Sequence, residues 1–369
     1  MKSAIIVAAI AAAAIIVAAG AAVALSSPGG GEERSGPVTV TDYLDREVTI
    51  GSSDRIVSQQ ANITAMLCGL GVGSRIVAAS SDAGIYDEDP GVIGMADDDF
   101  PKAVKDGIAA GRIKELGGMY NMSAETLVSV ESDLIIIGSY GITPETRKKL
   151  DDLGATYIVT SMSHNTIEDL YADMAIIGKA VGREAQAEKM ESEMRSAIGK
   201  ISGWCESIVD KEMGGTRPRV ALMMTSTYAT GDGYIGGDVL KALCADNVFG
   251  YVGRYAPVSK ESIAAEDPEA LMYQNVGMGD NVSSPAEYVM SLYGDPVIGR
   301  TSAAGSGSIF ATVDAAKNAT SYTNQGFVRA YAIWAMFIYH DSLPFDVPPV
   351  LDSGNCSEYL SKFWAVVSG

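Results

Sequence analysis

Two stretches of this chain repeat the same order of residue types. Residues 122–137 read MSAETLVSVESDLIII, and residues 258–273 read VSKESIAAEDPEALMY. Each copy has a serine two residues before a glutamate, Glu125 in the first and Glu261 in the second, then an acid and an apolar run. A serine just ahead of an acid is a helix-start signal, and a short apolar run indicates a buried strand. The repeat therefore predicts the same helix and strand built twice, in two comparable halves.

Alternating strand and helix patterns surround each copy of the repeat. Strands separated by helices at this spacing form parallel sheets with helices on their faces. The segments expected on these grounds are a hairpin at 38–50, a strand–helix–strand unit at 55–80, strands at 134–138 and 156–160 around a helix at 143–153, and then strands at 219–226, 270–275 and 308–314 with helices at 235–245, 285–294 and 324–340.

A long helical pattern separates the two halves. Apolar residues recur at helical spacing from about 166 to 210, and Gly178 and Gly182 are expected to divide this stretch into a shorter and a longer helix. A helix over 183–210 is about 40 Å long at 1.5 Å per residue, and its amphipathic pattern predicts that it packs along other elements. We expect an N-terminal α/β lobe at 38–165, a linker-helix region at 166–215 and a C-terminal α/β lobe at 216–369.

The amino-terminal segment predicts export. Residues 4–25 form an uncharged run. Its length suits either a membrane anchor or a cleaved signal peptide, and both alternatives stay open. Residues 26–37 are rich in Ser, Pro, Gly and charge, which is typical of a flexible linker. No cysteine follows the apolar run, which disfavours lipid attachment of the bacterial type. The folded body is thus expected outside the cytoplasm, either released or tethered to the membrane.

Composition disfavours several classes of function. The net charge of −19 makes nucleic acid and anionic lipid poor partners. His164 and His340 are the only histidines, no Gly-x-Ser-x-Gly motif is present, and the cysteines are scattered without a Cys-x-x-Cys pair. Neither a metal site nor a hydrolase triad is indicated, and we expect no catalysis. The cysteines are either buried thiols or partners in an extracellular disulfide, and they are Cys68, Cys205, Cys244 and Cys356.

Taken in order, these motifs resemble the substrate-binding proteins of ABC importers for iron complexes or vitamin B12. The resemblance covers about residues 38–366, and Ser132 replaces the proline usual before its strand. It implies two Rossmann-like lobes, a single long linker helix and a ligand cleft between the lobes, the arrangement of class III periplasmic binding proteins. The segments that carry it are TDYLDREVTI, RIVSQQANITAMLCGLGVGSRIVAAS, NMSAETLVSVESDLII, KKLDDLGATYIV, IGKAVGREAQAEKM and VSKESIAAEDPEAL.

The resemblance assigns a role to the two repeated glutamates. In the family, one glutamate on the rim of each lobe pairs with arginines of the membrane permease, and here the matching positions are Glu125 and Glu261. Two anions set apart on rigid lobes would fix the orientation of the protein on a two-subunit channel. The alternative is that each acid only favours the dipole of its own helix, a contribution of about 0.3–1 kcal/mol.

Tyrosines are frequent in the loops that follow the expected strands. Ligands of doubly wound sheets lie beyond the carboxyl ends of the strands, and tyrosine offers an apolar wall with a polar tip to a large chelate. Arginines would neutralise an anionic ligand. The alternative for each residue is ordinary loop packing. The candidate ligand-binding residues are Tyr86, Tyr120, Tyr140, Tyr228, Tyr234, Tyr255 and Tyr322 with Arg254 and Arg300, and Tyr140 and Tyr255 are the foremost.

These observations predict a binding subunit that captures an iron chelate of the ferric siderophore type outside the cytoplasm and delivers it to an ABC permease dimer with its ATPases. A corrinoid such as cobalamin, or haem, is the alternative ligand. An enzyme on a related two-lobed metal-cluster or chelatase-like scaffold, and a receptor without a permease, are alternatives of other classes. No cofactor beyond the ligand is expected, and the protein is expected to be a monomer.

Overall fold

A computed structural model describes residues 36–82, 100–118, 122–276, 284–321 and 323–369 of the chain. Its first half contains an antiparallel hairpin and a five-stranded parallel sheet in the order β5-β4-β3-β6-β7. The elements of this half are β1 (Val38–Thr41), β2 (Glu47–Ile50), β3 (Ile56–Ser58), α1 (Ala61–Gly69), β4 (Ile76–Ala79), α2 (Phe100–Ala109), β5 (Lys114–Glu115), α3 (Ala124–Leu127), β6 (Leu134–Gly138), the 3-10 turn η2 (Ser139–Gly141), α4 (Pro144–Asp152) and β7 (Tyr157–Thr160).

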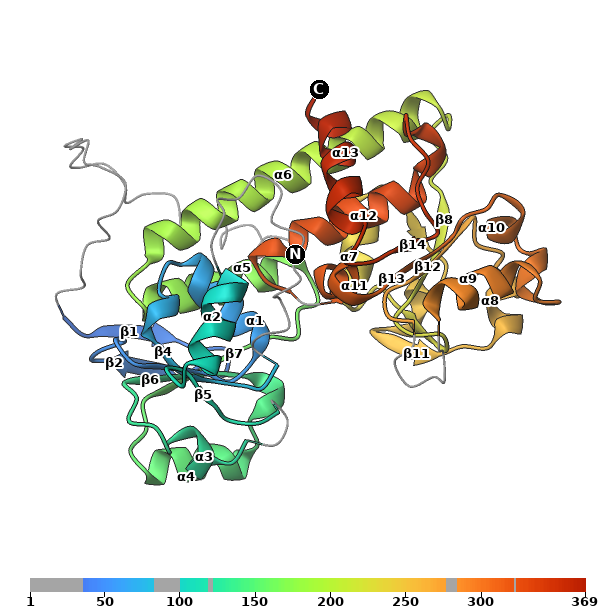
Figure 1. Ribbon diagram of the computed structural model, residues 1–369. Coiled ribbons are helices and arrows are strands. Elements are labelled where there is room, and N and C mark those ends of the chain that lie inside the picture. The colour runs from blue at the N-terminus through green and yellow to red at the C-terminus, as the bar shows by residue number, and fades with distance from the viewer. Residues whose placement is uncertain (1–35, 83–99, 119–121, 277–283, 322) are drawn as a thin grey trace, which may run out of the picture. The chain divides into compact units, whose positions relative to one another are not determined.

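Helices cover both faces of this sheet (Figure 1). Successive residues of a strand point to opposite faces, and the strands here are apolar on both sides. On β6, Ile136 packs into the cluster formed with α1 and α2, whereas Ile135 and Ile137 pack with Leu127 of α3 and Leu150 of α4. Fully buried strands explain why the sequence shows continuous apolar runs here instead of alternation. The expected strand–helix alternation of this half is confirmed.

Two helices lead out of the first half, as the periodicity predicted. They are α5 (Ile167–Ala180) and α6 (Glu184–Lys211). Gly182 separates them with a left-handed φ of +69°, a conformation that favours glycine. The prediction that Gly178 also breaks the helix is wrong, because this residue is buried inside α5. An added Cβ at Gly178 would stand 2.6 Å from the Cβ of Ala187, so this glycine permits close contact between the two helices.

The second half of the chain forms a seven-stranded sheet, with β10 beside β8 and the other strands in the order β11-β9-β8-β12-β13-β14. Its elements are β8 (Arg219–Met223), β9 (Tyr228–Thr230), α7 (Ile235–Ala242), β10 (Asp246–Asn247), the 3-10 turn η3 (Gly250–Val252), β11 (Tyr255–Pro257), α8 (Lys260–Glu266), β12 (Ala270–Tyr273), α9 (Pro285–Tyr293), the 3-10 turn η4 (Ile298–Arg300), α10 (Ser302–Gly305), β13 (Ile309–Thr312), α11 (Asp314–Ser321), the 3-10 turn η5 (Gln325–Phe327), α12 (Val328–Ile338), the 3-10 turn η6 (His340–Ser342), β14 (Val350–Leu351) and α13 (Cys356–Ser368).

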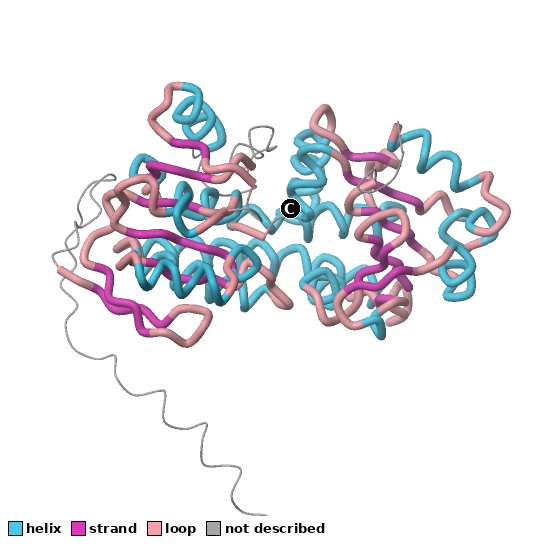
Figure 2. The backbone as a smooth tube through the Cα atoms, turned by 90° about the horizontal axis from the view of Figure 1, so that it is seen from below, coloured by secondary structure: helices cyan, strands magenta, loops and turns pink. Residues whose placement is uncertain are grey.

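The sequence pattern did not predict two antiparallel strands at one edge of this sheet. The stretches at 225–234 and 253–257 contain β9 and β11, which pair with each other and extend the sheet beyond β8. Their short length and their Gly-rich flanks hid them from the sequence pattern. The other strands pair in parallel, with helices on both faces (Figure 2). The two-sheet α/β architecture and the long linker helix are therefore as predicted.

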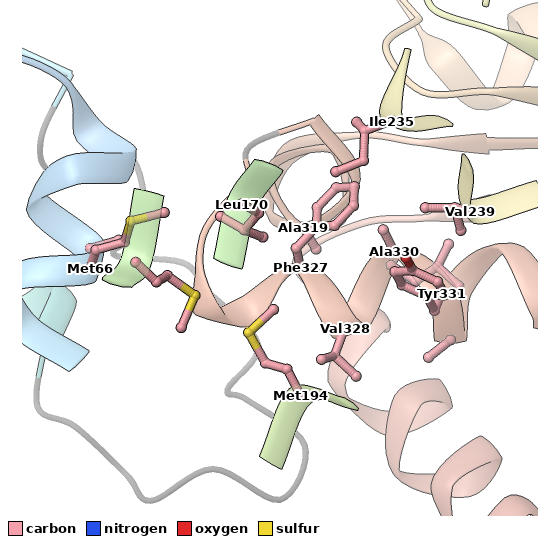
Figure 3. Packing of buried hydrophobic residues seen from close by; sticks show 14 of the residues in the cluster. Met66, Leu170, Met194, Ile235, Val239, Ala319, Phe327, Val328, Ala330 and Tyr331 are labelled. Atoms are coloured by element: carbon pink, nitrogen blue, oxygen red, sulfur yellow. The ribbon is translucent and has the colours of Figure 1, made fainter. Parts of the chain in front are cut away.

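One apolar cluster runs through both halves of the chain. It joins Met66 of α1, Leu170 of α5 and Met194 of α6 to Phe327 beside α12 and Ile235 of α7, and all five side chains are buried (Figure 3). Helix α6 contacts α12 and α13 as well as α5. Residues 34–369 accordingly form one compact unit. Shared burial of this kind resists independent motion of the two halves, because opening the contact returns apolar surface to water.

The repeat found in the sequence has the same local structure in both halves. Asp133 accepts hydrogen bonds from the backbone N–H groups of Asp54 and Arg55, just before β3, at 3.1 and 2.9 Å. Glu269 accepts one from the N–H of Arg219, the first residue of β8, at 2.8 Å. Each acid thus ties the start of its own strand to the start of the neighbouring central strand. The repeated acid is a structural element of the sheet.

Some predictions fall outside the described residues, namely the anchor or signal at 1–25 and the linker up to residue 35. Among the helices that the structure describes, none combines the length and apolar character needed to cross a bilayer. The four cysteines are free, with Cys205 and Cys356 buried.

Candidate ligand-binding site

The antiparallel ribbon of β9 and β11 presents tyrosines on one face. Tyr255 pairs directly with Thr230, and Tyr228 is two residues from Thr230 on the same strand. Directly paired residues share a face, as do residues two apart, so the two tyrosines lie on the same side of the ribbon. Tyr228 is 42% exposed and Tyr255 is 47% exposed. The ribbon thus offers two large aromatic side chains that the core does not bury.

A Gly-rich loop places Tyr234 and Arg254 beside this ribbon. An added Cβ at Gly231 would stand 2.3 Å from the carbonyl oxygen of Gly253, so only glycine allows these backbones to meet. The N–H of Gly233 donates to that same carbonyl at 2.7 Å. The Arg254 guanidinium lies 5.3 Å from the centre of the Tyr234 ring, which in turn meets Tyr255 edge to face at 6.4 Å.

On the first half of the chain, Tyr140 extends from the turn after β6. Gln59 accepts a hydrogen bond from the N–H of Gly138 at 3.1 Å, and the side chains of Gln59 and Gln60 occupy the space where Cβ atoms of Gly141 and Gly138 would stand. The turn is therefore fixed from beneath by buried glutamines. The Tyr140 side chain remains 55% exposed. This fixes the position of the backbone while leaving the phenol ring accessible.

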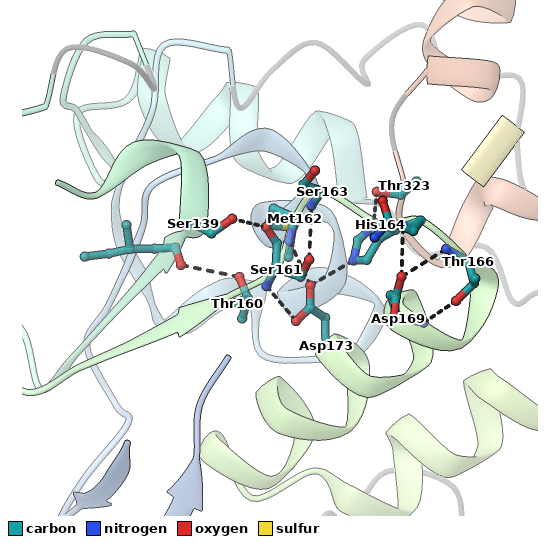
Figure 4. A network of polar contacts seen from close by, with 12 residues as sticks. Ser139, Thr160, Ser161, Met162, Ser163, His164, Thr166, Asp169, Asp173 and Thr323 are labelled. Atoms are coloured by element: carbon teal, nitrogen blue, oxygen red, sulfur yellow. Dashed lines mark hydrogen bonds and ion pairs between the residues drawn. The ribbon is translucent and has the colours of Figure 1, made fainter. Parts of the chain in front are cut away.

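Ser163 joins the two sets of residues. Its hydroxyl makes a hydrogen bond of 2.7 Å with the Tyr140 hydroxyl and accepts one of 2.5 Å from the Arg254 guanidinium. Figure 4 shows Ser163 in the connection after β7, next to buried polar groups. A single serine hydroxyl therefore links a residue of the first half to a residue of the second. We call this set the tyrosine–arginine cluster: Tyr140, Ser163, Tyr234, Arg254 and Tyr255.

Several polar atoms in the two halves of the chain are buried without a hydrogen-bond partner among the described residues. On the ribbon side they are the Nε of Arg254 and the hydroxyl of Thr230, and after β4 they are the Ser80 hydroxyl and both carboxylate oxygens of Asp82. Buried polar atoms are nearly always hydrogen-bonded in folded proteins. Arg254 therefore retains a donor for which the described residues supply no acceptor. No group of three or more His, Cys, Asp or Glu side chains in the described part of the chain is arranged to hold a metal ion.

The structure does not bring every predicted ligand residue into the cluster. Arg300 ends η4, which contacts α8, α9 and α10, and α10 is bonded through Ala303 to Pro268, just before β12. Arg300 is therefore associated with the amino ends of the strands, whereas ligands of such sheets lie at the carboxyl ends. Tyr86, Tyr120 and Tyr322 lie outside the described residues.

Glu125 and Glu261 have matching local environments. Each lies in the first turn of a short helix, α3 or α8, capped by a serine hydroxyl that accepts an N–H three residues on. The pKa of Glu125 is lowered to about 2. The causes are a hydrogen bond from its own backbone N–H, the ion pair with Lys149 at 3.0 Å and the Ser123 hydroxyl. The pKa of Glu261 is also lowered, first by its own backbone N–H and then by Ser259. Both residues are therefore exposed anions at neutral pH.

The two sites differ in one respect. Lys149 of α4 neutralises part of the charge of Glu125, whereas no ion pair is formed by Glu261 within the described ranges of the chain. Of the two glutamates, Glu125 is therefore partly neutralised by a lysine, whereas Glu261 keeps its full negative charge toward solvent.

The sequence did not predict Ser163 as a site residue, nor the hydrogen-bonded residues behind it, namely His164, Asp173 and Thr323. One signal was present. Asp173 lies within the apolar stripe of α5, next to Met174 and three residues after Leu170, and a charged residue there is buried and must be paired. His164 is 1% exposed and contacts Asp173 at 2.8 Å. Histidine is rare in this sequence, but this one is a buried partner of a carboxylate.

Comparison with known proteins agrees with this geometry. The family model described as periplasmic binding protein matches residues 56–312. An uncharacterized ABC transporter substrate-binding lipoprotein of Bacillus subtilis (strain 168), YvrC, is 24% identical over 239 residues, which cover 64% of this chain and 68% of that protein.

Two solved structures have the same fold. The periplasmic heme-binding protein RhuT from Roseiflexus sp. RS-1, in its apo form, is 18% identical with a TM-score of 0.60, and the match covers 78% of this chain and 99% of RhuT. A possible iron-binding periplasmic solute-binding protein from Staphylococcus epidermidis ATCC 12228 is 24% identical with a TM-score of 0.59, covering 78% and 98%.

Two α/β halves joined by a long helix, with a polar and aromatic cluster where they meet, define a two-lobed solute-binding protein. The chain belongs to the periplasmic binding protein family. It is a substrate-binding component of an ABC importer, a class that acts outside the cytoplasm and whose members bind and deliver solutes.

Proposed function

We propose that this protein captures a ferric chelate at the tyrosine–arginine cluster and carries it to its permease. The cluster itself carries the proposal. Three tyrosines and an arginine meet at the junction of the two halves, and two of these tyrosines are about half exposed. Single exposed aromatic side chains are common on protein surfaces, but several that meet beside a charged group form the kind of patch that is typical of a binding site.

The chemistry of the cluster suits iron held by oxygen donors. Tyr140 and Tyr255 offer phenol oxygens and flat apolar rings, and Arg254 offers a fixed guanidinium whose Nε has no acceptor within the described residues. An arginine recognises carboxylates and other anionic oxygens through paired N–H groups. The ligand expected is therefore a large, partly apolar, anionic iron complex. Ferric siderophores and haem, with its carboxylates, both fit this description.

The descriptions of two proteins with the same fold support the same choice. RhuT is described as heme-binding and the Staphylococcus epidermidis protein as possibly iron-binding. We infer further that Glu125 and Glu261 dock the loaded protein on the two permease subunits. Both are exposed, and both keep a low pKa through their own helix ends. The proposal also includes a permease dimer with its ATPase subunits as the partner, a monomeric state, and either a membrane tether through residues 4–25 or release after cleavage of this segment.

A titration of the full chain with three probes tests the ligand class. Ferric haem, a ferric trihydroxamate complex and cobalamin are each added to the purified protein in detergent, and absorption spectra and native mass spectra are recorded. The proposal expects one-to-one binding of haem or of the trihydroxamate complex. Cobalamin binding with no binding of the two iron probes would contradict the iron assignment and keep the importer class. No binding of any probe would contradict capture of a metal chelate at this cluster.

A further inference from the structure

The connection between β7 and α5 is held by one buried carboxylate. Asp173 of α5 accepts hydrogen bonds from the backbone N–H of Ser161 at 2.9 Å and from that of Met162 at 3.0 Å. Met162 has a φ of +47°, a left-handed conformation that residues other than glycine rarely adopt. The surrounding contacts must therefore impose this turn. Asp173 supplies two of these contacts. The turn places the next residue, Ser163, within hydrogen-bond distance of Tyr140 and Arg254.

His164 connects this carboxylate to the second half of the chain. Its Nε2 lies 2.8 Å from a carboxylate oxygen of Asp173, and its Nδ1 lies 2.5 Å from the hydroxyl of Thr323 (Figure 4). The ionised carboxylate can only accept, so Nε2 carries the proton and donates. Nδ1 and the Thr323 hydroxyl form the second hydrogen bond of the ring. His164, Asp173 and Thr323 are 1%, 1% and 6% exposed.

Thr323 belongs to a segment that is tied to the first half at a second point. Two residues on, the side-chain amide of Gln325 donates to the carbonyl oxygen of Ala65 in α1 at 2.9 Å, and both groups are buried. Turn η5, which contains Gln325, also contacts α6. The His164 ring therefore makes hydrogen bonds to Asp173 of α5 on one side and to Thr323 of the second half on the other.

We propose that His164 and Asp173 are positioning residues for the candidate ligand site. They hold Ser163 where its hydroxyl joins Tyr140 of one half to Arg254 of the other. The hydrogen bond of Thr323 to His164 fixes the His164 ring relative to the second half. This inference rests on the proposed function, because it treats the tyrosine–arginine cluster as the place where the ligand binds. His164 does not contact the ligand; it acts through Ser163.

A double-mutant cycle tests action through Ser163. A hydrogen bond to a charged partner contributes enough that its loss weakens binding about tenfold, so Ser163→Ala should raise Kd for the bound iron probe by about that factor. His164→Gln should raise Kd by a similar factor. If His164 works through Ser163, the double variant also shows about a tenfold rise. A rise of about a hundredfold in the double variant would overturn the proposal, because independent effects multiply.

The matched control is the other histidine. His340 is also bonded to a serine hydroxyl, that of Ser308 at 2.9 Å, but it lies in η6. His340→Gln should leave Kd within twofold. Thr323→Val, which keeps the shape and the His164–Asp173 contact, serves as the second test variant. It should weaken binding in a way that does not multiply with Ser163→Ala, and unchanged binding would refute the role of the second half.

Amide hydrogen exchange in the ligand-free chain separates this inference from the proposed function. His164→Gln should speed exchange of the Ser161 and Met162 amides at least tenfold, whereas Ser163→Ala and His340→Gln should not. Unchanged exchange in His164→Gln would overturn the positioning role whatever the ligand is. Accelerated exchange in a protein that binds neither ferric haem nor the trihydroxamate complex would support the positioning role and contradict the ligand assignment.

Discussion

Gly178→Ala tests the close packing of α5 on the linker helix α6. The new Cβ would stand 2.6 Å from the Cβ of Ala187, about 1 Å nearer than van der Waals contact allows. Forcing an extra methyl group into packed space costs about 1–3 kcal/mol. Alanine is favoured over glycine inside a helix by about 0.5–1 kcal/mol, which offsets part of that cost. The free energy of unfolding should therefore fall by roughly 0.5–2 kcal/mol.

Two glycines of α6 provide the matched control. Gly199 and Gly203 have no atom within 4 Å of an added Cβ, so alanine there gains helix propensity without a clash. Gly199→Ala and Gly203→Ala should raise the unfolding free energy by about 0.5–1 kcal/mol each. Urea unfolding followed by far-ultraviolet circular dichroism measures all three variants. If Gly178→Ala is as stable as Gly199→Ala, the close approach of α5 and α6 described here is wrong.

Two further predictions concern the exposed glutamates. The double variant Glu125→Lys, Glu261→Lys should abolish iron uptake by cells while its Kd for the iron probe stays within twofold. The control is the double variant Glu358→Lys, Glu287→Lys, which reverses first-turn acids on α13 and α9 and should leave uptake intact. Uptake that survives in the first double variant would contradict the docking role. Lys149→Met should raise the pKa of Glu125 from about 2 without restoring 4.5, because its own N–H and Ser123 still stabilise the carboxylate, as a carboxyl NMR titration would show. Because the pKa of Glu125 is lower in the folded state than in the unfolded state, its carboxylate stabilises the fold above pH 4.5, and this stabilisation is lost as pH falls toward 2. In Lys149→Met the stabilisation should be lost at a higher pH. An unchanged titration of Glu125 would mean that the ion pair does not form in solution.

The layered fold was predictable because its strands and helices carry strong local signals. The short apolar run LIIIG at 134–138 is typical of a strand buried between two helical layers, and the apolar spacing of α6 indicates both its length and its buried face. The errors come from contacts distant in sequence. Whether a glycine breaks a helix, as Gly182 does, or admits a neighbour, as Gly178 does, depends on what packs against it.

The candidate site was predictable only as residue types. Tyrosines after strands indicated a binding surface, but which ones meet depends on the pairing of β9 with β11 and on the approach of Gly231 to Gly253. No local pattern shows that Ser163 reaches both Tyr140 and Arg254, because those partners are 23 and 91 residues away along the chain. Arg300 illustrates the converse: the right residue type can lie at the wrong end of the strands.

Ligand binding at the tyrosine–arginine cluster can be measured directly. The dissociation constants for ferric haem and the ferric trihydroxamate complex should be measured for Tyr140→Ala and Tyr255→Ala beside Tyr43→Ala and Tyr251→Ala. The latter two side chains are 51% and 73% exposed but lie outside the cluster. Either cluster variant should weaken binding at least tenfold, because a bound ligand loses an aromatic contact, while the two control variants should stay within twofold. Tight binding by the Tyr140→Ala and Tyr255→Ala variants would contradict ligand binding at this cluster.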